Sequence, residues 1–193
     1  MRIDLSGTTD EAYLVECCKR NDPAAQHILY NKYVEDMMIL CLRYIAQHED
    51  AKEALMDGFL SFFRGIGSFS YRGEGSVKAW MKKVMVNSCL MHLRKQDRNT
   101  ILVADTTEYE HKEAGDDILG QLAAKEILRL LHELPDGYRM VFNLYVFEDM
   151  THKDIAEMLG ISESTSKSQL HRARALLQKQ ISQQTKSNEN AIG

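Results

Sequence analysis

Basic and hydroxyl side chains recur on one face of a predicted helix near the end of the chain. The stretch DIAEMLGISESTSKSQLHRAR, residues 154–174, places two short helical patterns on either side of Gly160 and Ile161. In such a pair, side chains early in the second helix can reach base edges in the major groove, and later basic ones can contact phosphates. The residues expected to face outward are Ser164, Thr165, Lys167, Ser168, His171, Arg172 and Arg174. The pattern predicts a helix-turn-helix that reads duplex DNA.

Local signals position this pair of helices. Thr151 followed by Asp154 is a variant of the capping box, and Ser162 is suited to cap the second helix. Gly160 can supply the left-handed conformation that ends the first helix. A helical hairpin with a solvated polar face is the plainer alternative. Because the helix caps, the glycine and the basic side chains on one face occur together, the pattern favours DNA binding.

A second group of residues, within 63–95, mixes aromatic and basic side chains around the glycine-bearing loop SYRGEGS. Single strands recover stacking on aromatic faces, worth about 1–3 kcal/mol per base, and a glycine loop lets the backbone approach an extruded base. Lys78, Lys82 and Lys83 fall within one and a half helical turns and could contact phosphates. Phe69 and Trp80 could instead be core residues. The aromatics of the group are Phe69, Tyr71 and Trp80, and its bases are Arg72, Lys78, Lys82, Lys83, Arg94 and Lys95.

The elements that carry these residues are predicted to be helices throughout. No segment alternates apolar and polar residues, and the chain has two prolines. Thr9 or Asp10 can cap a first helix, and Asp22 before Pro23 opens a second that runs to about Gln47. Asp50 could cap a third helix. Further helices are expected from Ser76 to about 95, over about 118–133, and from the break at Pro135 to about 147.

The charge distribution divides the chain into two small helical domains. The net charge is −4, but residues 101–120 hold six acids against one lysine, while 78–98 hold six bases against one acid. Apolar periodicity is lost where the acids accumulate. We therefore predict domains at 9–98 and 118–183, an acidic linker at 99–117 and a disordered tail at 184–193.

Composition excludes several classes of protein. No apolar run approaches the roughly 20 residues that cross a bilayer, and the first residues do not form a signal peptide, so we expect a cytoplasmic protein. Cys17, Cys18, Cys41 and Cys89 lack metal-ligand spacing and are expected to be buried reduced thiols. Redox sensing by the adjacent pair is the lesser alternative. No metal site and no cofactor are predicted.

Four stretches taken together resemble the bacterial sigma factors of the extracytoplasmic-function type, which retain the second and fourth sigma regions. The resemblance covers about 11–98 and 122–180. It implies a factor that binds core RNA polymerase, melts the −10 promoter element with its first domain and reads the −35 element with its second. The stretches are DPAAQHILYNKY, EDAKEALMDGFLSFF, FSYRGEGSVKAWMKKVMVNSCLMHLRK and LPDGYRMVFNLYVFEDMTHKDIAEMLGISESTSKSQLHRARALL.

The resemblance also implies residue roles. Glu53, Met56 and Asp57 would contact the clamp helices of the largest polymerase subunit, and the second domain would lie against the polymerase flap. The linker would pass near the active-site cleft. The resemblance further implies an anti-sigma factor as a partner and no small-molecule substrate. Contacts to the −10 strand would come from Phe69, Tyr71, Arg72, Trp80, Lys82, Lys83, Asn87 and Arg94, and contacts to the −35 duplex from the outward residues of the helix-turn-helix.

The chain departs from the family pattern at three positions of the reading helix. Ser166 stands where valine is common, and its hydroxyl is expected to bond back to its own helix. Lys167 replaces a frequent arginine and cannot make the same bidentate contact to guanine. His171 replaces what is often an aromatic residue or arginine. The promoter sequence therefore cannot be copied from other members.

Other functions stay open at this point. A conventional two-domain regulator would pair a sensing domain with the same helix-turn-helix. A metal-dependent nuclease could use Glu108, Glu110, Asp116 and Asp117, although these acids lie in the predicted linker, which offers no rigid first shell. An adaptor that sequesters polymerase fits poorly with two basic faces. The sequence therefore favours a non-enzymatic transcription initiation factor.

Overall fold

The computed structural model describes residues 10–99 and 118–192. The chain divides into two compact units, Met1–Tyr109 and Glu110–Gly193, at a point within the predicted linker. The described residues form helices and short turns without any strand, which confirms the all-α prediction. Residues 100–117, which make up nearly all of that linker, lie outside the described ranges.

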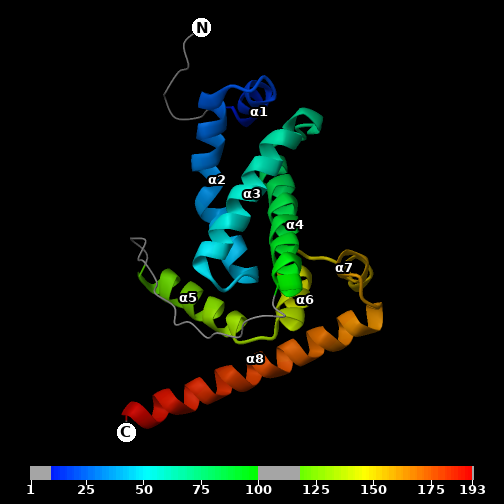
Figure 1. The fold of residues 1–193 in the computed structure, drawn as a ribbon. Coiled ribbons are helices and arrows are strands. Elements are labelled where there is room, and N and C mark those ends of the chain that lie inside the picture. The colour runs from blue at the N-terminus through cyan, green and yellow to red at the C-terminus, as the bar shows by residue number, and fades with distance from the viewer. Residues whose placement is uncertain (1–9, 100–117, 193) are drawn as a thin grey trace. The chain divides into compact units, whose positions relative to one another are not determined.

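The first unit is a helical bundle in which α2, α3 and α4 pack side by side (Figure 1). Two carboxylates begin its first helices as predicted. The Oδ1 atom of Asp10 accepts a hydrogen bond from the Ala12 N–H at 3.0 Å, and that of Asp22 accepts one from Ala24 at 2.9 Å. The elements are α1 (Glu11–Lys19), α2 (Pro23–Tyr44), α3 (His48–Gly65), the 3-10 turn η1 (Ile66–Ser68) and α4 (Ser76–Asn99).

Two helix boundaries differ from the prediction. Helix α2 ends at Tyr44 rather than Gln47, because Ile45 takes an extended conformation and buries its side chain. Helix α3 then begins at His48, so Asp50 lies inside its first turn and is not the cap. An acid in the first turn still stabilises the positive end of the helix dipole.

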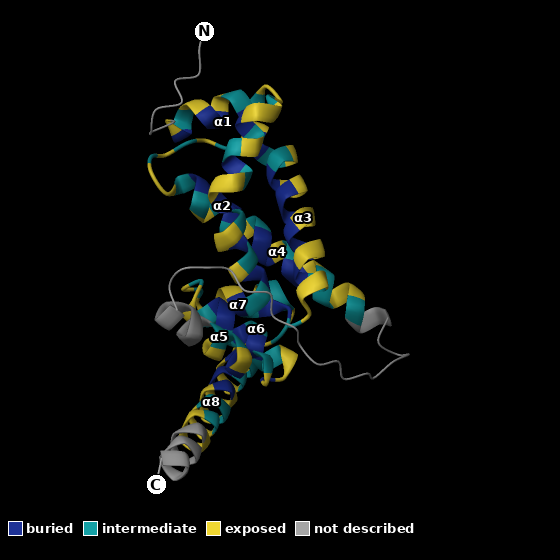
Figure 2. Cartoon of the chain, turned by 90° about the vertical axis from the view of Figure 1, so that its left-hand side faces the viewer, coloured by how far each residue is buried: buried dark blue, intermediate teal, exposed yellow. Residues whose placement is uncertain are grey.

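The core of the first unit is tightest where α3 crosses α4. A side chain at Gly58 would overlap the sulfur of Met85, so glycine permits the close approach of the two helices. Figure 2 shows buried residues along the helices of the bundle. The largest fully buried side chains here include Leu29, Met37, Leu40, Tyr44, Phe62, Met81 and Met85.

Three of the four cysteines lie in this core. Cys18, Cys41 and Cys89 are buried and Cys17 is half-buried, all as free thiols. Burial raises the pKa of Cys18 to about 11, and a hydrogen bond with Cys41 together with burial raises the pKa of Cys89. These two thiols therefore stay protonated at neutral pH and are poor nucleophiles. Complete burial was expected for all four, and Cys17 departs from it.

The second unit packs three helices against the long last one. Leu131, Leu134 and Ala173 form a buried cluster, against which Tyr138 and Phe142 pack. No helix within the described ranges is both long and apolar enough to cross a bilayer. The elements are α5 (Ile118–His132), α6 (Asp136–Val146), α7 (His152–Leu159) and α8 (Glu163–Ile192).

Helix α8 differs from the prediction at its end. It continues to Ile192 through the segment for which the sequence predicts a disordered tail. Polarity suggested disorder, but no glycine or proline interrupts the chain between Glu163 and Ile192. Glutamine, lysine and glutamate all have good helix propensity, so nothing in the local sequence ends the helix.

Candidate nucleic-acid interface

Helix α8 presents a polar face at its amino-terminal end. Thr151 caps α7 by accepting the Asp154 N–H at 3.2 Å, and Ser162 caps α8 by accepting the Thr165 N–H at 3.0 Å. Gly160 has the predicted left-handed conformation, with φ of 69°. Leu170 and Ala173 face the core. Of the predicted reading residues, Thr165 is half-buried against its cap, and the exposed ones are Ser164, Lys167, Ser168, His171, Arg172 and Arg174.

Several of these side chains already have partners within the unit. Lys167 Nζ lies 2.7 Å from Glu163 Oε1, and this hydrogen bond and charge lower the pKa of Glu163. Arg172 donates to the Tyr138 hydroxyl at 3.3 Å. The Arg174 guanidinium lies over the ring of Tyr145, 5.6 Å from its centroid. Such exposed contacts are weak, so the bases remain able to bind phosphate.

Ser166 makes a different contact from the predicted one. It is fully buried, and its Oγ lies 2.9 Å from Nδ1 of His152 on α7 instead of bonding back to its own helix. His152 in turn stacks on Tyr145 of α6, with ring centroids 4.7 Å apart. The hydroxyl therefore links the two motif helices. His152 could not be predicted from the sequence, because a histidine after a capping threonine carries no signal of its partner.

Two of the predicted aromatic residues and two of the predicted basic residues of the first unit meet at a hollow. It has a volume of about 430 Å³ and lies between the loop after η1 and the start of α4. Phe69 and Trp80 stack on each other with centroids 4.8 Å apart, and Trp80 also contacts the buried Phe62 at 4.8 Å. Phe69 and Trp80 therefore pack partly in the core, as the alternative prediction held, and each also lines the hollow. The hollow is lined by Ser68, Phe69, Ser70, Arg72, Ser76, Ala79, Trp80 and Lys83.

Glycines and one serine hold the loop beside this hollow. Gly73 and Gly75 have φ of 104° and 81°, which other residues rarely adopt. Ser76 Oγ donates to the Gly73 carbonyl at 2.7 Å and accepts from the Arg72 N–H at 3.2 Å. The three lining serines are contacts that the sequence analysis missed, because serine in a loop usually signals a turn.

Tyr71 is half-buried outside the lining of the hollow. Partial burial and the nearby Glu11 carboxylate raise the pKa of Tyr71. Glu11 is itself buried, and it accepts hydrogen bonds from Tyr33 and from Lys32 of α2. The structure therefore associates Tyr71 with the buried Glu11 and not with the hollow.

The predicted lysine stripe on α4 separates into two sides. Adjacent helical residues point about 100° apart, so Lys82 and Lys83 face different directions. Lys82 shares its side with Lys78, whose Nζ is 2.5 Å from Asp36 Oδ2 of α2. Lys83, Asn87 and the exposed Arg94 follow one another along the side that carries Trp80.

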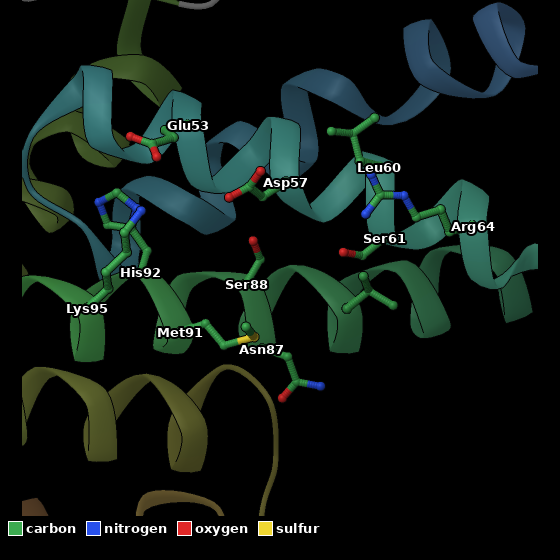
Figure 3. A pocket seen from close by; sticks show the side chains of 11 residues that line it. Glu53, Asp57, Leu60, Ser61, Arg64, Asn87, Ser88, Met91, His92 and Lys95 are labelled. Carbon is green, nitrogen blue, oxygen red and sulfur yellow. The ribbon is translucent and has the colours of Figure 1, made fainter.

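A groove between α3 and α4 brings together residues predicted for two different partners. Glu53 and Asp57 of α3, expected to bind polymerase, line a cavity of about 640 Å³ with Asn87 of α4, expected to bind DNA (Figure 3). Met56 is 46 % exposed on the same helix but does not line this groove. Leu60 and Met91 add exposed apolar surface to its walls.

Family models match both units of the chain. Sigma-70 region 2 matches residues 29–99, and sigma-70 region 4 matches residues 124–177. The ECF RNA polymerase sigma-E factor of Haemophilus influenzae is 28 % identical over 184 residues, 90 % of this chain and 95 % of that protein. The chain is an ECF sigma factor.

Two further relatives of this chain are also named sigma factors. The RNA polymerase sigma-H factor of Pseudomonas aeruginosa is 26 % identical over 179 residues, 87 % of this chain and 92 % of that protein. The ECF RNA polymerase sigma factor SigM of Mycobacterium tuberculosis is 35 % identical over 130 residues, 67 % of this chain and 63 % of that protein. This sigma factor therefore acts in transcription initiation, and a conventional regulator is not favoured.

Solved structures share its fold. The sigma factor RpoE in complex with the anti-sigma factor NepR from Bartonella quintana has a TM-score of 0.53 at 18 % identity, covering 81 % of this sigma factor and 96 % of that chain. CnrH in complex with the cytosolic domain of CnrY has a TM-score of 0.50 at 17 % identity. The match covers 89 % of this sigma factor and 97 % of that chain.

Proposed function

We propose that this sigma factor divides its work among three surfaces, one for core polymerase and two for promoter DNA. The polymerase surface is the exposed side of α3 that carries Glu53, Met56 and Asp57. Within the described residues, neither carboxylate forms an ion pair or hydrogen bond. Both are thus available to basic groups on the clamp helices of the largest polymerase subunit.

The hollow beside the glycine loop holds an unpaired base of the −10 element. The hollow is the one observation on which the proposal rests, because aromatic ring faces, two cationic side chains and a tight backbone turn lie together there. Arg72 and Lys83 supply charge for the adjacent phosphates, and Asn87 and Arg94 extend the path of the strand along α4. Lys82 adds positive charge near the strand from the neighbouring side of α4. Tyr71 affects binding indirectly, by positioning the glycine loop.

Helix α8 reads the −35 duplex, and its unit also contacts the polymerase flap. Lys167, Ser168 and His171 stand early enough in the helix to reach base edges, with Ser164 and Thr165 at its start. Arg172 and Arg174 are placed to contact phosphates. Base contacts made by this unit position the polymerase at the upstream promoter element, whereas the first unit opens the DNA strands.

Reconstituted transcription with core polymerase tests this division. Combined Arg72→Ala and Lys83→Ala substitutions should lower permanganate reactivity of the −10 region at least about tenfold, because two charge contacts of about 1 kcal/mol each are lost. Holoenzyme assembly should be unchanged. Asp57→Lys should instead weaken polymerase binding, and strand opening should fall only as far as holoenzyme is lost. Arg20→Ala, which removes an exposed cation after α1, is the matched control. Normal strand opening by the double variant would contradict the proposal.

An anti-sigma factor is the remaining partner that we infer. Met56, Leu60 and Met91 are exposed apolar residues next to the acids of α3 and the groove. A partner helix covering them would also block polymerase from Glu53 and Asp57. Such a partner should therefore compete with core polymerase for the chain, and simultaneous binding of both would contradict this inference.

A further inference from the structure

One end of the α3–α4 groove carries three side chains of the kinds that bind transition metals. Asp50 and Glu53 lie three residues apart on α3. His92 extends from α4 toward Glu53 (Figure 3). One ligand atom from each of the three lies within 4.8 Å of the others. We propose that these residues bind a divalent first-row transition metal ion such as Zn²⁺ or Co²⁺.

The distance between His92 and Asp50 supports an ion between them. His92 Nε2 lies 3.8 Å from Asp50 Oδ1, which is too long for a hydrogen bond. Ligands that are each about 2.0–2.2 Å from one metal ion stand roughly 3–4 Å apart, so this separation fits two atoms of one coordination sphere. To bind the same ion, the exposed side chain of Glu53 would turn toward this pair, and the Gln96 amide would leave His92 Nε2.

The surroundings hold these ligands in place. The side chain of His92 is 10 % exposed, and α3 and α4 are rigidly packed together. The Gln96 Nε2 atom lies 2.6 Å from Asp50 Oδ2 and 3.2 Å from His92 Nε2, so one amide contacts both side chains and orients them toward each other. An ion bound at His92 Nε2 would replace the longer of these two contacts. Glu53 is exposed, and none of the described residues forms a hydrogen bond or ion pair with it. This is the arrangement of primary and supporting ligands expected of a metal site.

The donor set determines the class of metal. Two carboxylates and one imidazole suit zinc, cobalt, nickel, manganese or iron, whereas calcium and magnesium prefer oxygen ligands alone. The groove gives the ion access to solvent, so water completes its coordination. Lys95 lines the same groove, and its charge weakens the site without removing a ligand.

Spectroscopic titration of the full-length protein with Co²⁺ tests the site. Saturable binding should produce visible d–d bands without the thiolate-to-cobalt charge-transfer band that cysteine ligands would add. His92→Gln and Asp50→Asn should each weaken binding at least about tenfold. Lys95→Ala should tighten it. Glu35→Gln, which removes an exposed acid of α2 that does not line the groove, should bind as the unaltered protein does.

Three results would overturn the proposal. These are the absence of saturable binding, a thiolate charge-transfer band, or equal affinity in His92→Gln and Glu35→Gln. Circular dichroism of each variant separates loss of the ligand from loss of the helices. Because Glu53 also belongs to the proposed polymerase surface, a bound ion would compete with polymerase for that carboxylate. That consequence rests on the proposed function, whereas the titration uses the free chain and does not.

Discussion

At the scale of single residues, the reading helix is restrained by its own side chains. Lys167, the candidate base reader, is paired with Glu163 one turn earlier. Both are exposed, so the pair contributes little to stability. In the proposed contact of α8 with the −35 duplex, the pair would place a carboxylate near the DNA phosphates, and we expect Glu163 to lower affinity for the duplex.

Glu163→Gln should raise affinity for a −35 duplex about two- to fivefold at low salt, because one opposing charge is lost and Lys167 is released. Lys167 lowers the pKa of Glu163, so the carboxylate stays charged down to a pH below the usual range. The difference between variant and unaltered protein should vanish only as the pH falls through that lowered pKa. Fluorescence anisotropy measures it, with Glu157→Gln on α7 as the control. Equal affinities at neutral pH would refute this reading.

At the scale of elements, the helix-turn-helix depends on one backbone conformation and one buried bond. Gly160 ends α7 with a left-handed φ, and no atom lies within 4 Å of where its Cβ would be. The His152–Ser166 bond then fixes α7 against α8. Since space is available at Gly160, only backbone strain opposes another residue there.

Gly160→Ala should destabilise the second unit by about 1–2 kcal/mol, and Gly160→Asn by less, because asparagine tolerates the left-handed region. Chemical denaturation measures both. Gly137→Ala in α6 is the control, since only the flexible end of Gln169 lies near and alanine favours the helix. If alanine and asparagine were equally tolerated at 160, the strain argument would fail.

At the scale of the whole molecule, charge is separated along the chain. The net charge is −4, yet both predicted DNA-binding segments are basic and the acids gather in residues 101–120. We expect core polymerase to supply much of the promoter affinity of this sigma factor. An acidic connector can therefore repel free duplex without weakening the holoenzyme.

Replacing the linker acids by their amides should strengthen duplex binding in the absence of polymerase. The effect should shrink as salt is raised, because screening weakens the repulsion. An electrophoretic mobility shift assay at two salt concentrations measures it, with amide replacements of as many exposed acids on α2 and α3 as the control. An unchanged shift would refute the role of the linker. The acids replaced are Asp105, Glu108, Glu110, Glu113, Asp116 and Asp117.

Local rules determined much of this protein from its sequence. Asp10, Asp22, Thr151, Ser162 and Gly160 begin or end helices as predicted, because a cap depends on residues within one turn of it. The helical periodicity likewise indicated which side of α8 is polar. Where two local rules competed, as polarity and helix propensity did after residue 183, the prediction and the structure differ.

Tertiary packing decided what no local rule could. The stacking of Phe69 on Trp80, the bond between Ser166 and His152, and the meeting of Asp50 with His92 join residues on different elements. Their proximity depends on how closely the helices approach, and at Gly58 that approach is set by the absence of a single side chain. Sequence spacing places residues on one face of one helix, whereas the packing of the helices determines which faces meet.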